Sequence, residues 1–135
     1  MLLYATLGTA DTARAVRFYD AVMEVLGQPR LPDWTPEGWA GWGKDYDHGF
    51  GLWVCPPFDG NPPAPGNGAM LAFRADSAAQ VRAFHAAGLA HGGGDEGAPG
   101  LRDAYGPEFY VAYLRDPDGN KLACVFHHYD PAQDA

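Results

Sequence analysis

The sequence predicts an α+β fold in which one order of elements, a strand, a helix and then short strands, occurs twice. An apolar segment followed by a helical pattern begins at residue 2 and again at residue 69. The two predicted helices are also similar in sequence, because residues 16–21 (VRFYDA) resemble residues 81–86 (VRAFHA). The two segments are 65 positions apart in a chain of 135 residues. A repeated order of elements is stronger evidence for a duplicated unit than one matching helix.

The first half begins with an apolar strand predicted over residues 2–9. Asp11 can cap the helix that follows, in which apolar residues recur at helical spacing, and Gly27 can end it. Glycines and prolines then separate short aromatic runs at residues 38–43 and 49–55, which predict strands joined by turns.

The second half repeats this pattern after a Pro-, Gly- and Asn-rich stretch. A strand is predicted over residues 69–73, and a helix capped by Asp76 or Ser77 is predicted over residues 78–89, ending around Gly88. Two last strands are predicted over residues 109–115 and 121–128, joined by a tight turn from Asp116 to Gly119. We therefore expect a single domain over residues 1–135, composed of module 1 (1–55), a linker (56–68), module 2 (69–128) and a short tail (129–135).

The glycine-rich segment that follows the second helix matches a nucleotide-binding pattern only in its letters. Residues 92–97 read G-x-G-x-x-G, but the dinucleotide motif needs a preceding strand and a helix that begins within it. Pro99 and Gly100 follow instead, and Asp95 and Glu96 would repel phosphate. We expect residues 92–100 to form a flexible loop.

Composition and charge narrow the classes of partner. Hydrophobic residues make up 47% and charged residues 19% of the chain, as in ordinary globular proteins. The formal charge of -8, without any basic run, argues against nucleic acid and against an anionic membrane surface, although local arginines could still attract a small anion. No apolar run approaches the roughly 18 residues of a membrane span.

Cysteine usage and the N-terminal residues indicate the compartment. Cys55 and Cys124 lie in apolar, strand-like runs, so we predict two small buried thiols rather than a disulfide or a metal site. Residues 1–10 contain no basic residue and no small-residue cleavage site, which predicts no secretion signal. We therefore expect a cytoplasmic protein.

Segments from both halves resemble one known family. They are residues 6–8, 13–22 and 26–27 in the first half, and residues 97–100, Arg102, Tyr105, Tyr110 and residues 116–120 in the second. Together they resemble small members of the vicinal oxygen chelate superfamily, the group of glyoxalases, bleomycin resistance proteins and extradiol dioxygenases. The resemblance implies two βαβββ modules that form an open, cupped eight-stranded mixed sheet with the helices outside. It also implies a small-molecule ligand in the cup and, commonly, a homodimer.

Strand periodicity agrees with a cup. Side chains alternate between the two faces of a strand, and in the first, fifth and last strands of the resemblance one face is uniformly apolar, as expected under the helices. The opposite face is mixed and would line the cup, with Tyr4, Thr6, Met70, Arg74, Ala123 and His127.

The resemblance further implies a divalent metal held by two histidines and one glutamate. Those three positions are Tyr4, Met70 and Ala123 in this sequence. A phenol is a weak ligand, a thioether is a soft one and a methyl group is none. The fourth ligand of some members would come from the strand around Leu52 and Trp53, which has no carboxylate. We therefore expect neither a divalent metal nor another cofactor.

The five histidines do not suggest a substitute site. We expect His48 and His91 in loops and His85 on the solvated face of a helix. His127 and His128 are adjacent in a predicted strand, so they would face opposite sides.

Aromatic and cationic residues remain as candidates for ligand contact. Tryptophans 34, 39, 42 and 53 crowd the first half, where they would form either a flat wall against a ligand or core, loop and dimer contacts. Arg74 would attract a carboxylate or phenolate or would form a surface salt bridge, and Arg102 and Tyr105 would contact the ligand or pin a loop. The full set of candidates is Tyr4, Thr6, Trp42, Trp53, Met70, Arg74, Arg102, Tyr105, Tyr110, Ala123 and His127.

Three functions follow from this sequence. The first is a metal-free dimer that binds a small organic molecule. The second is a lyase, isomerase or dioxygenase of the same superfamily, with an unrecognised metal or an acid–base pair drawn from Tyr4, Arg74 and His127. The third is a non-catalytic interaction module. No catalytic residue is assigned, and a filled cup would favour the third function.

Overall fold

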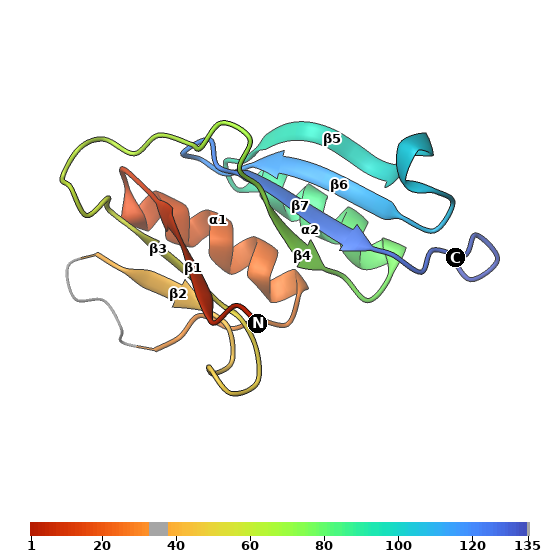
Figure 1. The fold of residues 1–135 in the computed structure, drawn as a ribbon, viewed down its shortest axis with the longest axis horizontal. Coiled ribbons are helices and arrows are strands. Elements are labelled where there is room, and N and C mark those ends of the chain that lie inside the picture. Colours follow the sequence, from red (N-terminus) through yellow and green to blue (C-terminus); the bar gives the residue numbers. More distant parts are fainter. Residues whose placement is uncertain (33–37, 135) are drawn as a thin grey trace.

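The computed structural model describes residues 1–32 and 38–134, and it places both helices on one side of two small sheets (Figure 1). In chain order the elements are β1 (Tyr4–Gly8), α1 (Thr12–Val25), β2 (Ala40–Trp42), β3 (Gly51–Cys55), β4 (Leu71–Arg74), α2 (Ala78–Ala90), β5 (Gly94–Leu101), the short 3-10 helix η1 (Asp103–Tyr105), β6 (Tyr110–Arg115) and β7 (Lys121–Phe126). The predicted α+β fold with its helices outside is confirmed.

The two sheets repeat one topology. The first has the strand order β1-β3-β2 and the second has the order β4-β7-β6-β5. In each sheet the first strand along the chain lies parallel to the last strand along the chain, β1 to β3 and β4 to β7. The described residues form seven strands in two sheets rather than eight in one. Beyond β2, the described residues extend the first sheet by an isolated bridge between Arg30 and Trp42, where the Leu31 N–H donates to the Gly41 carbonyl at 2.8 Å.

Local signals set the helix boundaries as predicted. The Asp11 carboxylate accepts the Arg14 N–H at 3.0 Å, and the Ser77 hydroxyl accepts the Gln80 N–H at 3.1 Å. Gly27 ends α1 with a φ of +69°, a conformation that glycine adopts without a steric penalty.

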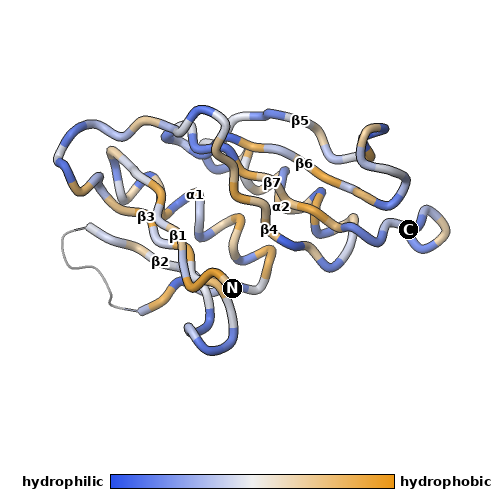
Figure 2. The backbone as a smooth tube through the Cα atoms, in the orientation of Figure 1, coloured by the Kyte–Doolittle hydropathy of each residue, from blue (hydrophilic) through white to orange (hydrophobic). Residues whose placement is uncertain are grey.

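The core lies between the helices and the sheets. Each helix buries one apolar side, with Phe18 and Val22 on α1 and Val81 and Phe84 on α2. Figure 2 shows hydrophobic residues along β4, β6 and β7, whereas β5 at the edge of the sheet is largely hydrophilic. The predicted burial of the thiols is confirmed, because Cys55 and Cys124 are both buried and unpaired. Burial raises the pKa of Cys124 to about 12.

The expected loop at residues 92–100 is wrong, because β5 occupies most of it. β5 runs antiparallel to β6, with irregular register on both sides of Gly97. An edge strand with mostly exposed side chains needs no alternation of apolar and polar residues, so the sequence pattern does not reveal it. A Cβ at Gly97 would lie 2.8 Å from the Tyr113 ring on β6, so this glycine permits the close approach of the two strands.

The expectation of a solvated His85 is also wrong. His85 is 8% exposed and its Nε2 lies 2.9 Å from Oδ1 of Asp95, which joins α2 to β5. This hydrogen bond, together with the N–H of Gly97, holds the pKa of Asp95 below its ordinary value.

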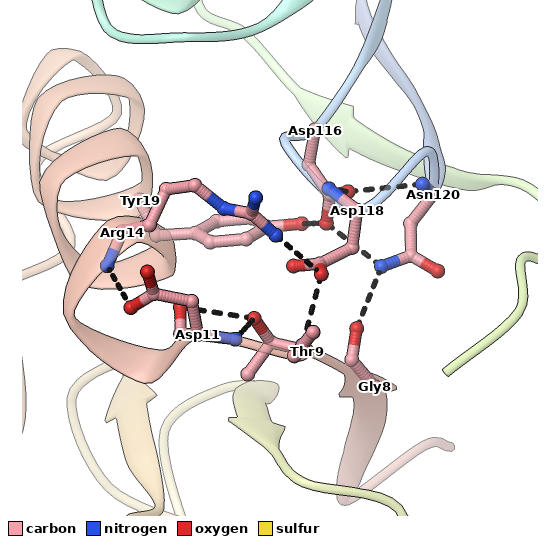
Figure 3. A network of polar contacts seen from close by, with 9 residues as sticks. Gly8, Thr9, Asp11, Arg14, Tyr19, Asp116, Asp118 and Asn120 are labelled. Carbon is pink, nitrogen blue, oxygen red and sulfur yellow. Dashed lines mark hydrogen bonds and ion pairs between the residues drawn. The ribbon is translucent and has the colours of Figure 1, made fainter. Parts of the chain in front are cut away.

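A buried polar network joins the turn between β6 and β7 to the first half of the chain (Figure 3). Asp116 accepts the hydroxyl hydrogen of Tyr19 at 2.5 Å and an amide hydrogen of Asn120 at 2.8 Å. The same amide group of Asn120 donates to the Gly8 carbonyl at 3.2 Å, and Arg14 forms an ion pair with Asp118 at 2.7 Å. The Asp-Pro-Asp-Gly-Asn turn is therefore also the clamp between the two halves.

None of the helices in the described part of the chain is long and apolar enough to cross a membrane.

Candidate functional site

The free edges of β1 and β4 face each other across a seam between the two sheets (Figure 1). One end of this seam is closed by the hydrogen bonds from Asn120 to Gly8 and from the Ala10 N–H to Asp118. Toward the other end a cleft of about 870 Å³ opens between β4 and the first half of the chain. Its lining is Met1, Leu2, Met23, Leu26, Gln28, Trp42, residues 43–44 and 46–50, Leu52 and residues 70–74.

The backbone of β4 contributes to the cleft because β4 pairs with β7 alone. The Ala75 N–H donates to the Val125 carbonyl at 2.8 Å, so the alternation of an edge strand directs the backbone groups of Ala72 and Arg74 away from β7 and into the seam. The cleft therefore offers backbone donors and acceptors as well as side chains.

The polar side chains of the cleft come from two segments. Arg74 lies at the end of β4, and Lys44, Asp47 and His48 lie between β2 and β3. The His48 ring is hydrogen-bonded to the Asp45 carboxylate, with a distance of 2.8 Å between Nδ1 and Oδ1. The remaining lining is mainly apolar, so the cleft combines apolar walls with a few charged groups.

Three predicted candidates, Met70, Arg74 and Trp42, line this cleft. Met70 and Arg74 are exposed, as expected for the open face. Trp42 is only 1% exposed, packs against Tyr19 and donates its indole N–H to Asp20 at 2.9 Å, so it belongs mainly to the core.

Three other candidates lie on the open face of the first sheet. Tyr4 and Thr6 are exposed on β1, and the Tyr4 ring lies 6.1 Å from that of Tyr46. Trp53 lies over Gly41, where a Cβ would come within 2.5 Å of its ring, and its indole N–H donates to the Tyr46 hydroxyl at 3.1 Å. Tyr4 and Thr6 lie on β1, which borders the seam, whereas Trp53 lies on the central strand β3, and none of the three lines the cleft. Trp34 lies outside the described residues.

Arg102 and Tyr105 are remote from the cleft. Arg102 donates to the Ala98 carbonyl at 2.7 Å and lies 5.6 Å from the centre of the Tyr113 ring, which holds the end of β5 in place. Tyr105 is 60% exposed and contacts Phe109. The structure therefore favours the alternative in which Arg102 pins this segment.

Tyr110, Ala123 and His127 also lie apart from the cleft. Tyr110 packs on the helix side, accepts a hydrogen bond from Arg82 at 3.1 Å and stacks on Tyr129. Ala123 is fully buried. His127 is exposed beyond the end of β7 and its ring lies 4.1 Å from that of His128, so the expected opposite orientation of the two histidines is wrong.

Sequence reasoning missed Lys44, Tyr46 and Tyr113. Lys44 and Tyr46 reach the cleft from the turn between β2 and β3, and Tyr113 lies between two cations, Arg102 at 5.6 Å and Lys121 at 5.2 Å from its ring centre. Alternation along β6 places Tyr113 on the open face, but only the register with Ala123 and Gly97 shows what it contacts.

Comparison with known proteins decides the family. The sequence profile of the Glyoxalase/Bleomycin resistance protein/Dioxygenase superfamily matches residues 2–124. The chain belongs to this superfamily. A crystal structure of a glyoxalase/bleomycin resistance protein from Albidiferax ferrireducens is 36% identical, with a TM-score of 0.80 over 93% of this chain and 97% of that one.

Two more distant solved structures share the fold. A lactoylglutathione lyase from Agrobacterium tumefaciens is 21% identical, with a TM-score of 0.62 over 93% of this chain and 92% of that one. TnmS3, an antibiotic binding protein from a Streptomyces species, is 23% identical, with the same TM-score of 0.62 over 93% of both chains. No curated protein matches the sequence.

The divalent metal that this superfamily implies does not fit the residues present. The three expected ligand positions carry the phenol of Tyr4, the thioether of Met70 and the fully buried methyl group of Ala123. Across residues 1–32 and 38–134, no three His, Cys, Asp or Glu side chains lie close enough together to hold a metal ion. A hard or borderline divalent ion needs several oxygen or nitrogen donors, and these three positions supply only a phenol oxygen, which is a weak ligand.

Proposed function

We propose that the protein binds a small organic molecule in the cleft beside β4 and needs no divalent metal to do so. The observation that carries the proposal is the cleft itself, about 870 Å³ in volume, whose lining includes Met70, a thioether at a position where the superfamily resemblance implies a metal ligand. Cavities of roughly 300–1,000 Å³ with apolar walls and a few polar groups are typical of small-molecule sites.

The fold is compatible with binding without catalysis. TnmS3, described as an antibiotic binding protein, has this fold. An enzyme of the same superfamily is the alternative, and it would need an acid–base pair at the ligand. Of the three residues named for such a pair, Tyr4, Arg74 and His127, only Arg74 lines the cleft. This arrangement favours binding.

Metal analysis tests the proposal directly. The protein is purified without chelator, and its metals are measured by elemental mass spectrometry at known protein concentration. We expect far less than one metal per chain and no change in Tm on adding nickel, zinc, manganese or ferrous iron. About one metal per chain, lost with EDTA and restored with a gain in Tm, would overturn the metal-free proposal.

Two further predictions from the sequence accompany this function. A homodimer is expected, and native mass spectrometry at micromolar concentration tests it. A cytoplasmic location is expected, and fractionation of the producing cells tests it.

A further inference from the structure

We infer that the ligand of this cleft is an organic anion with an apolar body, and that Arg74 and Lys44 hold its negative group. This inference rests on the proposed function, because it names the chemical class of the molecule that the cleft binds.

The first argument is the pairing of the cations. The chain has 17 acidic and 9 basic residues, so carboxylates are abundant. Four arginines form ion pairs with carboxylates, and these are Arg14, Arg30, Arg82 and Arg115. Arg74 and Lys44 form no ion pair or hydrogen bond with the described residues, and both line the cleft. Although acidic residues are abundant in this chain, no carboxylate in its described part pairs with Arg74 or Lys44. Both cations of the cleft are therefore available to bind an anion.

The second argument is the geometry around Arg74. Arg74 offers two kinds of donor, the guanidinium of its side chain and its backbone N–H, which points into the seam. The backbone N–H of Ala72 also points into the seam. One carboxylate or sulfonate can therefore accept hydrogen bonds from a side chain and from the strand edge, and those to the guanidinium are charge-assisted. Lys44 approaches from the opposite wall, on the segment between β2 and β3.

The other charges of the cleft do not cancel this arrangement. Asp47 lies in the lining on the same segment as Lys44, and the His48 ring is bonded to Asp45. With histidine neutral, the lining side chains carry two positive charges and one negative charge, in a chain whose formal charge is -8. The cleft is thus a locally positive region of an acidic protein.

The third argument is the exposed apolar surface beside these cations. Leu2 is 64%, Tyr46 is 50% and Met70 is 44% exposed, and all three line the cleft. Apolar surface gathered at a concave site is stabilised when a ligand covers it. The ligand therefore has an apolar body, aromatic or aliphatic, and a single acidic group.

A matched pair of fluorescent probes tests this inference. The anion 1-anilinonaphthalene-8-sulfonate and the uncharged N-phenyl-1-naphthylamine share one aromatic body, and only the first has a sulfonate. We expect Arg74→Met to weaken binding of the sulfonate about tenfold, the effect of one charge-assisted hydrogen bond, and to leave binding of the neutral probe unchanged. Arg74→Lys should retain part of the sulfonate affinity, and Lys44→Met should cause a smaller loss than Arg74→Met.

Arg17 provides the matched control. It is exposed on α1, has no carboxylate partner among the described residues and does not line the cleft, so Arg17→Met should leave both affinities unchanged. Displacement of the sulfonate by indole-3-acetate or by decanoate distinguishes an aromatic from an aliphatic ligand. Arg74→Met affecting both probes equally, or neither, would overturn the anion inference while the proposed function stands. Failure of the wild-type protein to bind either probe would overturn the proposed function and this inference together.

Discussion

The hydroxyl of Tyr19 on α1 donates a hydrogen bond of 2.5 Å to Oδ2 of Asp116, at the start of the turn between β6 and β7. Both residues are buried, and they are 97 positions apart in the chain. Burial, followed by the nearby charge of Asp116, raises the pKa of Tyr19 well above its ordinary value, so the phenol stays protonated and remains a donor. This bond ties the helix of the first half to the last hairpin of the second.

We expect Tyr19→Phe to lower the free energy of unfolding by about 1–3 kcal/mol, since it removes a donor from a buried carboxylate. Urea denaturation measures the change. Tyr105→Phe removes the same hydroxyl from a side chain that is 60% exposed, and it should change the stability by less than about 0.5 kcal/mol. Equal stabilities of wild type and Tyr19→Phe would show that the clamp contributes nothing.

Gly41→Ala should destabilise the protein by about 1–3 kcal/mol, as crowding of a packed site does. The new Cβ would lie 2.5 Å from the ring of Trp53, which is 5% exposed and hydrogen-bonded to Tyr46, so the ring cannot move aside freely. Thermal unfolding and tryptophan fluorescence measure the effect. Gly49→Ala is the control because no atom lies within 4 Å of its added Cβ, and an equal loss in both variants would rule out the contact with Trp53 as the cause.

Alkaline pH should weaken the fold through Cys124. Burial raises the pKa of this thiol from 9.0 to about 12. Between these values the unfolded chain releases the proton and the folded chain keeps it, so stability falls as pH rises, by about 1.4 kcal/mol per pH unit at most. Urea unfolding of wild type and Cys124→Ala between pH 8 and 11 should show a shallower decline in the variant. Parallel declines would assign the alkaline loss to other groups.

Acidic pH should weaken the joint between α2 and β5. The hydrogen bond from His85, followed by that of the Gly97 N–H, holds the pKa of Asp95 below its ordinary 3.8. The contribution of ionised Asp95 to the free energy of unfolding is complete above pH 3.8. It is lost as the pH falls through the lowered pKa of the folded state. Asp95→Asn should therefore lose less stability than wild type between pH 6 and pH 3, measured by urea unfolding. Asp103→Asn, an exposed control on η1, should follow wild type, and the same acid response in all three proteins would contradict this role.

Features fixed by local chemistry could be predicted from the sequence. The caps at Asp11 and Ser77 and the positive φ of Gly119 depend on a few neighbouring residues, and the structure has all three. The helices and the inner strands follow from apolar periodicity, because one side of each is buried. The repeated order of elements predicted two similar halves, and the superfamily resemblance added how their strands form a sheet.

Features that depend on contacts between distant segments could not be predicted. β5 is an edge strand whose Gly97 is required by Tyr113, a residue on another strand. Trp42 and Trp53 looked alike in the sequence, yet Trp42 faces the helices and Trp53 the open face, because of their positions in strands β2 and β3. The cleft was missed in part because Lys44 and Arg74, which both line it, belong to segments 30 positions apart in the chain.

The clamp at the closed end of the seam has a consequence for the order of events during synthesis. The Asn120 side chain donates a hydrogen bond to the Gly8 carbonyl, 112 positions away in the chain. The Asp118 carboxylate accepts one from the Ala10 N–H, 108 positions away. Because synthesis proceeds from the N-terminus, β1 leaves the ribosome long before Asn120 and Asp118 have been made. Contacts between residues so far apart in the chain also form slowly, because a long loop must first close. The closed end of the seam therefore forms only after residue 120 has emerged, whereas β1 can already pair with β3 once residue 55 is available.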